Sequence, residues 1–130
     1  TFTKLIASID TSSIDTGIQK RDDHLKSSDF FDTTTYPLMK FKMTEYLSGG
    51  TKGKMYGNLY IKDKMQVIKL DTTIHGVIKD FQGNERIGFT LEGTLNRKDF
   101  GLEWNKVLDS GGVAVGDTVT LLIEVEAIEL

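Results

Sequence analysis

The chain has 130 residues, of which 38% are hydrophobic and 27% are charged, and its formal net charge is −3. This length and composition are typical of one globular domain over residues 1–130, and the acidic balance argues against a nucleic-acid partner, which rewards clustered Lys and Arg. The absence of cysteine excludes disulfides and thiolate chemistry. No apolar run approaches the ~18–20 residues that span a bilayer, so we expect no integral membrane segment.

The first nine residues already have the pattern of an extended strand, with no turn before them. From this abrupt start we expect that one or two further strands precede them in the complete protein. The next stretch is rich in Asp, Ser and Thr, which favour turns, and Asp15 or Thr16 can cap a short helix that begins near Ile18. Its apolar stripe is narrow, with Ile18 and Leu25 alone, so we expect this helix to cover another part of the molecule.

Two aromatic residues and the only proline follow the helix. Phe30 and Phe31 lie on a second short turn, and Pro37 biases the residue before it to extended backbone, which starts a strand. We expect the helix and this turn to form a lid, with both phenylalanines directed towards the interior.

The rest of the chain has the pattern of long strands joined by short turns. Alternating apolar residues predict strands over 38–46, 55–61, 67–78, 86–100 and 118–128. Gly76 indicates a bulge, and a long glycine-rich loop holds Trp104. Short turns pair neighbouring strands antiparallel, and the lack of βαβ spacing predicts an all-β sandwich or up-and-down barrel. Strands of ~9–14 residues exceed the usual length and favour the barrel.

The inward positions of these strands carry aliphatic, aromatic and methionine side chains. They can fill a solid core or line a cavity for an apolar ligand, and alternation alone does not separate the two. Met39, Met43 and Met55 fall on neighbouring inward faces, and flexible thioethers suit a wall that adapts to a flexible chain. Together with the lid, the candidate ligand-binding residues are Leu25, Phe30, Phe31, Met39, Phe41, Met43, Met55, Leu59, Ile68, Leu70, Ile87, Phe89, Leu91, Leu121 and Ile123.

Several motifs follow one another along nearly the whole chain. The most specific are Arg21-Asp22-x-His24-Leu25-x-Ser27-x-Asp29-Phe30-Phe31-Asp32 and Leu95-x-Arg97-x-Asp99-Phe100-Gly101. Weaker ones are Tyr36-Pro37-x-x-x-Phe41, Tyr56-Gly57-x-Leu59, Arg86-x-Gly88-Phe89 and Val115-Gly116-Asp117-x-Val119. In these motifs and in their order the chain resembles the YceI-like family of bacterial lipid-binding proteins.

The resemblance implies a lipocalin-like antiparallel β-barrel of eight strands, of which six are readable here, with one short covering helix. It implies non-catalytic binding or carriage of a long-chain amphiphile, a polyisoprenoid or a fatty acid or amide, in an apolar tunnel inside the barrel. It also implies a periplasmic or secreted location and a homodimer. The bound lipid or isoprenoid is then the expected partner, with no other cofactor.

Four residues are candidates for the rim of the tunnel or for contact with a ligand head group: Arg21, His24, Arg97 and Trp104. His24 is either a surface histidine or a polar contact or pH-sensitive hinge at the mouth. Arg97 shares a strand face with Asp99 in this interpretation, and either forms an ion pair or binds the head group through its guanidinium fork. Trp104 either plugs the barrel end or borders the mouth.

Motifs of catalysis are absent from the sequence: it has no Gly-x-Ser-x-Gly, no His-Glu-x-x-His and no phosphate loop. We therefore expect no enzyme, and two distant histidines without a cysteine predict no metal site. Two alternatives stay open. One is a lipid-modifying hydrolase or isomerase with His24 as its base, and the other is a structural interaction domain with a solidly packed core.

Overall fold

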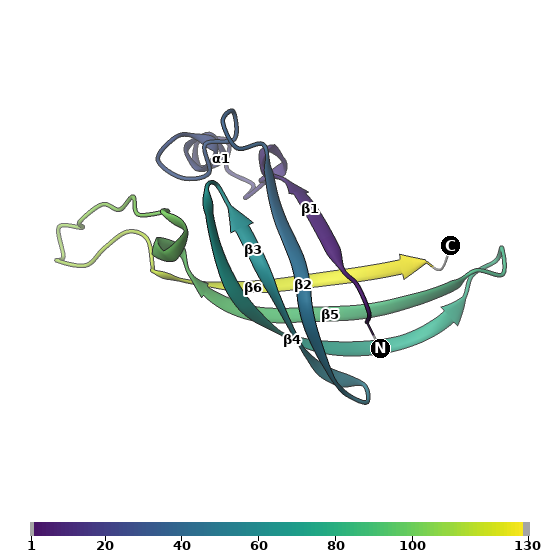
Figure 1. Ribbon diagram of the computed structural model, residues 1–130. Coiled ribbons are helices and arrows are strands. Elements are labelled where there is room, and N and C mark those ends of the chain that lie inside the picture. The colour runs from purple at the N-terminus through teal and green to yellow at the C-terminus, as the bar shows by residue number, and fades with distance from the viewer. Residues whose placement is uncertain (1, 129–130) are drawn as a thin grey trace.

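The computed structural model describes residues 2–128, which form one antiparallel sheet and one α-helix (Figure 1). The six strands lie in the sheet in chain order, so each pairs with the next. The elements are β1 (Ile6–Asp10), η1 (Thr11–Ser13), α1 (Gln19–Lys26), β2 (Leu38–Gly49), β3 (Lys52–Ile61), β4 (Lys64–Lys79), β5 (Glu85–Asn96), η2 (Arg97–Phe100) and β6 (Thr118–Ile128), where η denotes a 3₁₀ helix.

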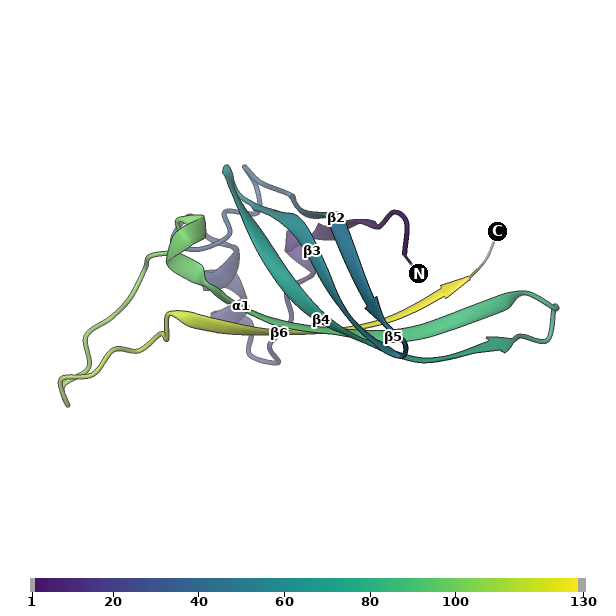
Figure 2. The same ribbon diagram turned by 60° about the horizontal axis from the view of Figure 1, so that its bottom comes forward.

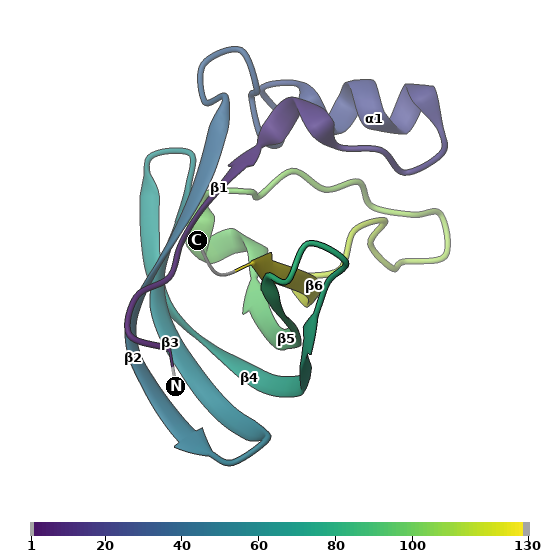
Figure 3. The same ribbon diagram turned by 90° about the vertical axis from the view of Figure 1, so that its right-hand side faces the viewer.

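The sheet is strongly curled rather than flat. β1, β2 and β3 form one wall, β5 and β6 form the other, and β4 bends between them (Figure 3). Two inner-face glycines, Gly57 of β3 and Gly93 of β5, allow close packing, because a Cβ at Gly57 would collide with the ring of Phe41 and one at Gly93 with Leu70. Among the described strands, β1 and β6 are not hydrogen-bonded to each other, so the sheet is a half-barrel. The predicted all-β antiparallel fold is confirmed.

The hairpins and the bulge agree with the sequence signals. Gly50 has a φ of 78°, and this left-handed conformation closes the short turn between β2 and β3. The register of β4 against β5 shifts between Ile74 and Gly76, which confirms the bulge predicted at Gly76.

The fifth predicted strand is shorter than expected and ends at Asn96. The Asn96 side chain accepts a hydrogen bond from the backbone N–H of Lys98 and so caps η2. The expectation that Arg97 and Asp99 share a strand face is therefore wrong. The turn of η2 directs Arg97 into the interior, where it is 3% exposed, and leaves Asp99 at the surface.

The core lies on the concave side of the sheet. Its most buried side chains are Met55 of β3, Leu70 of β4 and Phe100 of η2. At the end of the sheet distant from α1, the ring of Phe2 lies edge-on against Tyr46 and Phe89, with ring centroids 4.9 and 4.8 Å apart. These contacts follow from the alternation of apolar and polar residues, which places every second side chain on the inner face.

Helix α1 lies over the opposite end of the half-barrel (Figure 3). The segment before this helix is attached to the residues just before β2 through Thr11, whose hydroxyl donates to the carbonyl oxygen of Tyr36 at 2.8 Å. The predicted side-chain cap is wrong: the N-cap residue is Ile18, and no side chain caps the helix there. Instead, the carboxylate of Asp22 accepts hydrogen bonds from the backbone N–H and the hydroxyl of Thr16, which ties the preceding loop to the first turn.

Candidate binding cavity

The inner face of the half-barrel encloses a cavity of about 340 Å³. Every residue that lines it is apolar, and both edge strands contribute, so the cavity bridges the space between β1 and β6. The lining residues are Leu5, Ile6, Ala7, Ile9, Phe31, Met39, Phe41, Leu59, Ile61, Ile68, Leu70, Leu91, Leu95, Leu102, Val119, Leu121, Ile123 and Val125.

The two-residue period of the strands builds this wall. On β6, for example, Leu121, Ile123 and Val125 line the cavity, whereas Leu122 and Glu124 between them are exposed on the other face. Many of the residues predicted to bind ligand do lie in the wall. They are Phe31, Met39, Phe41, Leu59, Ile68, Leu70, Leu91, Leu121 and Ile123.

The other predicted ligand-binding residues lie outside the cavity wall: Leu25, Phe30, Met43, Met55, Ile87 and Phe89. Met55 is completely buried in the core, and Phe89 packs against Phe2 at the far end of the sheet. Of the three methionines expected to form an adaptable wall, Met39 alone lines the cavity.

Part of the wall was not among the predicted binding residues. Four of its members continue the same alternation along their strands: Ile61, Leu95, Val119 and Val125. Four others come from the N-terminal segment, where the period was ambiguous: Leu5, Ile6, Ala7 and Ile9. Leu102 follows η2 and is 4% exposed. No periodic signal in the sequence could have found it, because its position depends on how the turn of η2 ends.

Three aromatic rings join α1 to the loop after η2. The ring of His24 lies edge-on to the indole of Trp104, with centroids 4.4 Å apart, and to Phe30 at 5.1 Å. His24 Nε2 also pairs with the carboxylate of Asp29 at 2.9 Å. Phe30 and Phe31, although adjacent, therefore face different surroundings. Phe31 lines the cavity, whereas Phe30 packs into this aromatic cluster.

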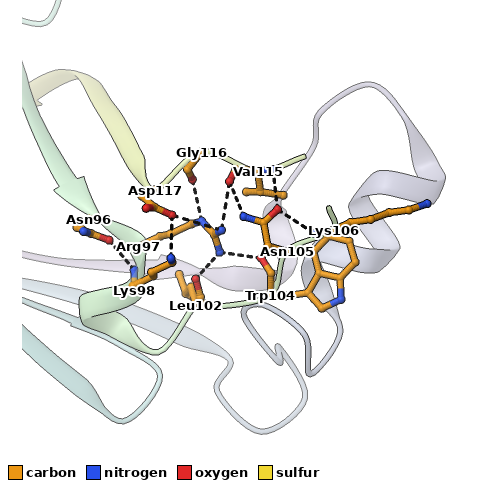
Figure 4. A network of polar contacts seen from close by, with 10 residues as sticks. All are labelled: Asn96, Arg97, Lys98, Leu102, Trp104, Asn105, Lys106, Val115, Gly116 and Asp117. Atoms are coloured by element: carbon orange, nitrogen blue, oxygen red, sulfur yellow. Dashed lines mark hydrogen bonds and ion pairs between the residues drawn. The ribbon is translucent and has the colours of Figure 1, made fainter. Parts of the chain in front are cut away.

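Arg97 fixes the loop that carries Trp104 (Figure 4). Its guanidinium donates to the carbonyl oxygens of Leu102, Trp104, Val115 and Gly116, and Asp117 lies 3.8 Å away. The Asn105 side chain adds a bond to the same carbonyl of Val115 at 2.8 Å. Figure 2 shows this loop extending away from the sheet beyond η2. The geometry gives Arg97 a structural role in place of the predicted head-group contact, because its N–H groups are directed at backbone carbonyls.

The remaining predicted rim residue, Arg21, is exposed and turned towards its own loop. Its Nε donates to the hydroxyl of Thr16 at 2.9 Å, and an Nη donates to the Thr16 carbonyl oxygen at 3.0 Å. The hydrogen bond from the Thr16 hydroxyl holds the pKa of Asp22 below its ordinary value, although burial opposes the shift. This loop is thus a small polar network at the base of α1, outside the cavity wall.

A second hollow lies on the opposite face of the sheet, over the paired glycines Gly76 and Gly88. It is a wide groove with polar sides, where His75 Nε2 lies 2.6 Å from the hydroxyl of Thr90. In residues 2–128 no three His, Asp or Glu side chains gather so that they could hold a metal ion. None of the described helices is long and apolar enough to cross a membrane.

Comparisons with known proteins support the assignment made from the motifs. A model of the YceI-like domain matches residues 1–127. A UPF0312 protein of Staphylococcus epidermidis is 37% identical over 120 residues, which are 92% of this chain and 68% of the relative. A UPF0312 protein of Pectobacterium carotovorum is 36% identical over 125 residues, 96% of this chain and 62% of the relative.

Solved structures with the same architecture cover nearly all of the chain. The crystal structure of a Campylobacter jejuni YCEI protein is 39% identical and superimposes with a TM-score of 0.86, covering 100% of this chain and 74% of that protein. Burkholderia cenocepacia BcnA is 25% identical, with a TM-score of 0.80 over 95% of this chain and 74% of BcnA.

Proposed function

The chain belongs to the YceI-like domain family, and from this membership we propose that it binds the hydrocarbon chain of an amphiphile in its inner cavity. The ligand is a polyisoprenoid or a fatty acid or amide, and the protein carries it without catalysing a reaction. The family resemblance is also the support for a periplasmic or secreted location and for a homodimer.

The observation that carries this proposal is the wholly apolar cavity of about 340 Å³. Protein interiors are close-packed and contain few voids larger than a water molecule. A domain whose inner face served only as a solid core would fill this space with its own side chains. The alternative of a solidly packed interaction domain is therefore not favoured.

The enzymatic alternative has little support from the geometry. His24 is not part of the cavity wall, and its Nε2 is paired with Asp29. Its ring packs against Trp104 and Phe30, so the residue proposed as a base contributes to the attachment of α1. The names of the relatives carry no enzyme activity either.

The test is to purify the protein from cells, extract it with organic solvent and identify the extract by mass spectrometry. We expect a stoichiometric long-chain lipid or isoprenoid. A second arm titrates the delipidated protein with the uncharged fluorophore N-phenyl-1-naphthylamine and displaces it with a fatty acid. The proposal fails if no lipid is extracted and the delipidated protein binds neither the fluorophore nor the fatty acid. Conversion of the extracted lipid on incubation with the protein would instead support an enzyme.

A further inference from the structure

We infer that the cavity selects its ligand by the hydrocarbon chain and does not discriminate between head groups of different charge. This inference rests on the proposed function and adds the class of ligand to it. The ligands are amphiphiles with an anionic, cationic or uncharged head group, and they bind because their apolar chain fits the cavity. The cavity wall carries no side chain that could recognise a charge, because all of its residues, from Leu5 to Val125, are apolar.

The two arginines predicted at the rim of the cavity are already engaged in bonds within the protein. Arg97 adjoins the lining residue Leu102, but it is 3% exposed and donates to four backbone carbonyls. Arg21 bonds Thr16 through two of its nitrogens. A ligand carboxylate would have to break bonds of Arg97 to obtain it as a partner, and breaking them would leave buried carbonyl oxygens unsatisfied. At Arg21 it would compete with the two bonds to Thr16.

Three polar side chains of the α1 segment, Asp22, His24 and Asp29, are engaged as well. Asp29 pairs with His24, whose ring is held between Phe30 and Trp104. The buried carboxylate of Asp22 already accepts two hydrogen bonds from Thr16. In the described part of the chain, a charged head group therefore finds no free complementary group at the wall of the cavity.

A charge moved into an apolar cavity without a partner loses its hydration and gains nothing in return. The head group therefore stays in water, and only the chain enters. The free energy of binding is then proportional to the apolar surface that is buried. At ~0.8 kcal/mol per CH₂, each additional methylene raises the affinity about fourfold. At about 30 Å³ per water-sized group, the cavity holds a segment of roughly ten carbons.

The experiment compares three ten-carbon ligands that differ in head group: decanoate, decylamine and 1-decanol. Each displaces N-phenyl-1-naphthylamine from the delipidated protein at physiological salt, where the Debye length is ~8 Å and surface charge is largely screened. We expect the three dissociation constants to agree within about threefold, since the buried chain is the same. Shortening decanoate to octanoate removes two methylenes and weakens binding by about 15-fold.

A preference of about tenfold or more for decanoate or for decylamine would overturn the inference while leaving the proposed function intact. The variant Arg21→Gln tests whether Arg21 is the source of such a preference. A loss of affinity for decanoate alone would identify Arg21 as a head-group contact. If the ratio of the three constants is unchanged in Arg21→Gln, the inference stands. If neither the fluorophore nor any of the ten-carbon ligands binds, the proposed function itself fails and the inference with it.

Discussion

The guanidinium of Arg97 donates a hydrogen bond to the carbonyl oxygen of Trp104 at 2.9 Å, so a buried cation holds the backbone of the residue whose indole meets α1. Through this bond η2, at the end of β5, is connected to the helix near the other end of the chain. The loop and α1 are thus parts of one assembly over the end of the half-barrel.

We expect Arg97→Met to lower the free energy of unfolding by about 3 kcal/mol, because several buried carbonyl oxygens lose their donor at once. Urea denaturation followed by circular dichroism measures the change. Arg21→Gln is the matched control, since Arg21 is exposed, and should cost no more than about 0.5 kcal/mol. Equal effects of the two substitutions would contradict the structural role of Arg97.

The neighbouring leucines of β6 give a direct test of the cavity. Leu121 lines it, whereas Leu122 is 63% exposed on the other face. Leu121→Trp should fill part of the cavity and weaken fluorophore binding about tenfold or more, because fewer carbons of the ligand can be buried. Leu122→Trp should leave the affinity unchanged. Binding titrations of both variants decide this, and loss of binding in Leu122→Trp alone would place the ligand on the outer face.

Two glycines of the strands differ in what surrounds them. A Cβ at Gly57 would collide with the Phe41 ring, whereas one at Gly88 would meet no atom within 4 Å. We expect Gly57→Ala to destabilise the protein by about 1–3 kcal/mol through overpacking. The free energy of unfolding of Gly88→Ala should stay within about 0.5 kcal/mol of that of the parent. Thermal unfolding measured by calorimetry compares them, and a fully stable Gly57→Ala variant would show that the packing of β3 against the Phe41 ring does not require a glycine at this position.

The lowered pKa of Asp22 predicts a pH dependence of stability. A carboxyl group whose pKa is lower in the folded state than its ordinary value of 3.8 stabilises the fold above that value. This contribution is lost as the pH falls through the folded-state pKa. Asp22→Asn should therefore have a lower melting temperature than the parent at pH 6, and the difference should shrink as the pH falls below 3.8.

Melting curves recorded between neutral and acidic pH check this expectation. The control is Asp23→Asn, because Asp23 is exposed and its carboxylate contacts the side chain of Gln19. If the difference in melting temperature between Asp22→Asn and the parent stays constant with pH, the charge of Asp22 is not what stabilises the loop.

The sequence by itself determined the strands, their antiparallel order and the family. Alternation with a period of two residues is a local property of the chain, so it identified nearly half of the wall, including Leu59, Leu70 and Leu121. The bulge at Gly76 could also be read locally, because a glycine in a strand pattern marks such a site.

The tertiary structure alone decided which groups the four predicted rim residues contact. Periodicity gives the side of a strand on which a residue lies, but it does not give the partners that a long polar side chain reaches. The hydrogen bonds of Arg97 depend on η2, which takes the place of the last residues of a predicted strand. They also depend on the path of the following loop, which brings the carbonyl oxygens of Val115 and Gly116 back to Arg97. The different surroundings of Phe30 and Phe31 likewise depend on where Trp104 is held. These contacts join residues far apart in the chain, so no local pattern records them.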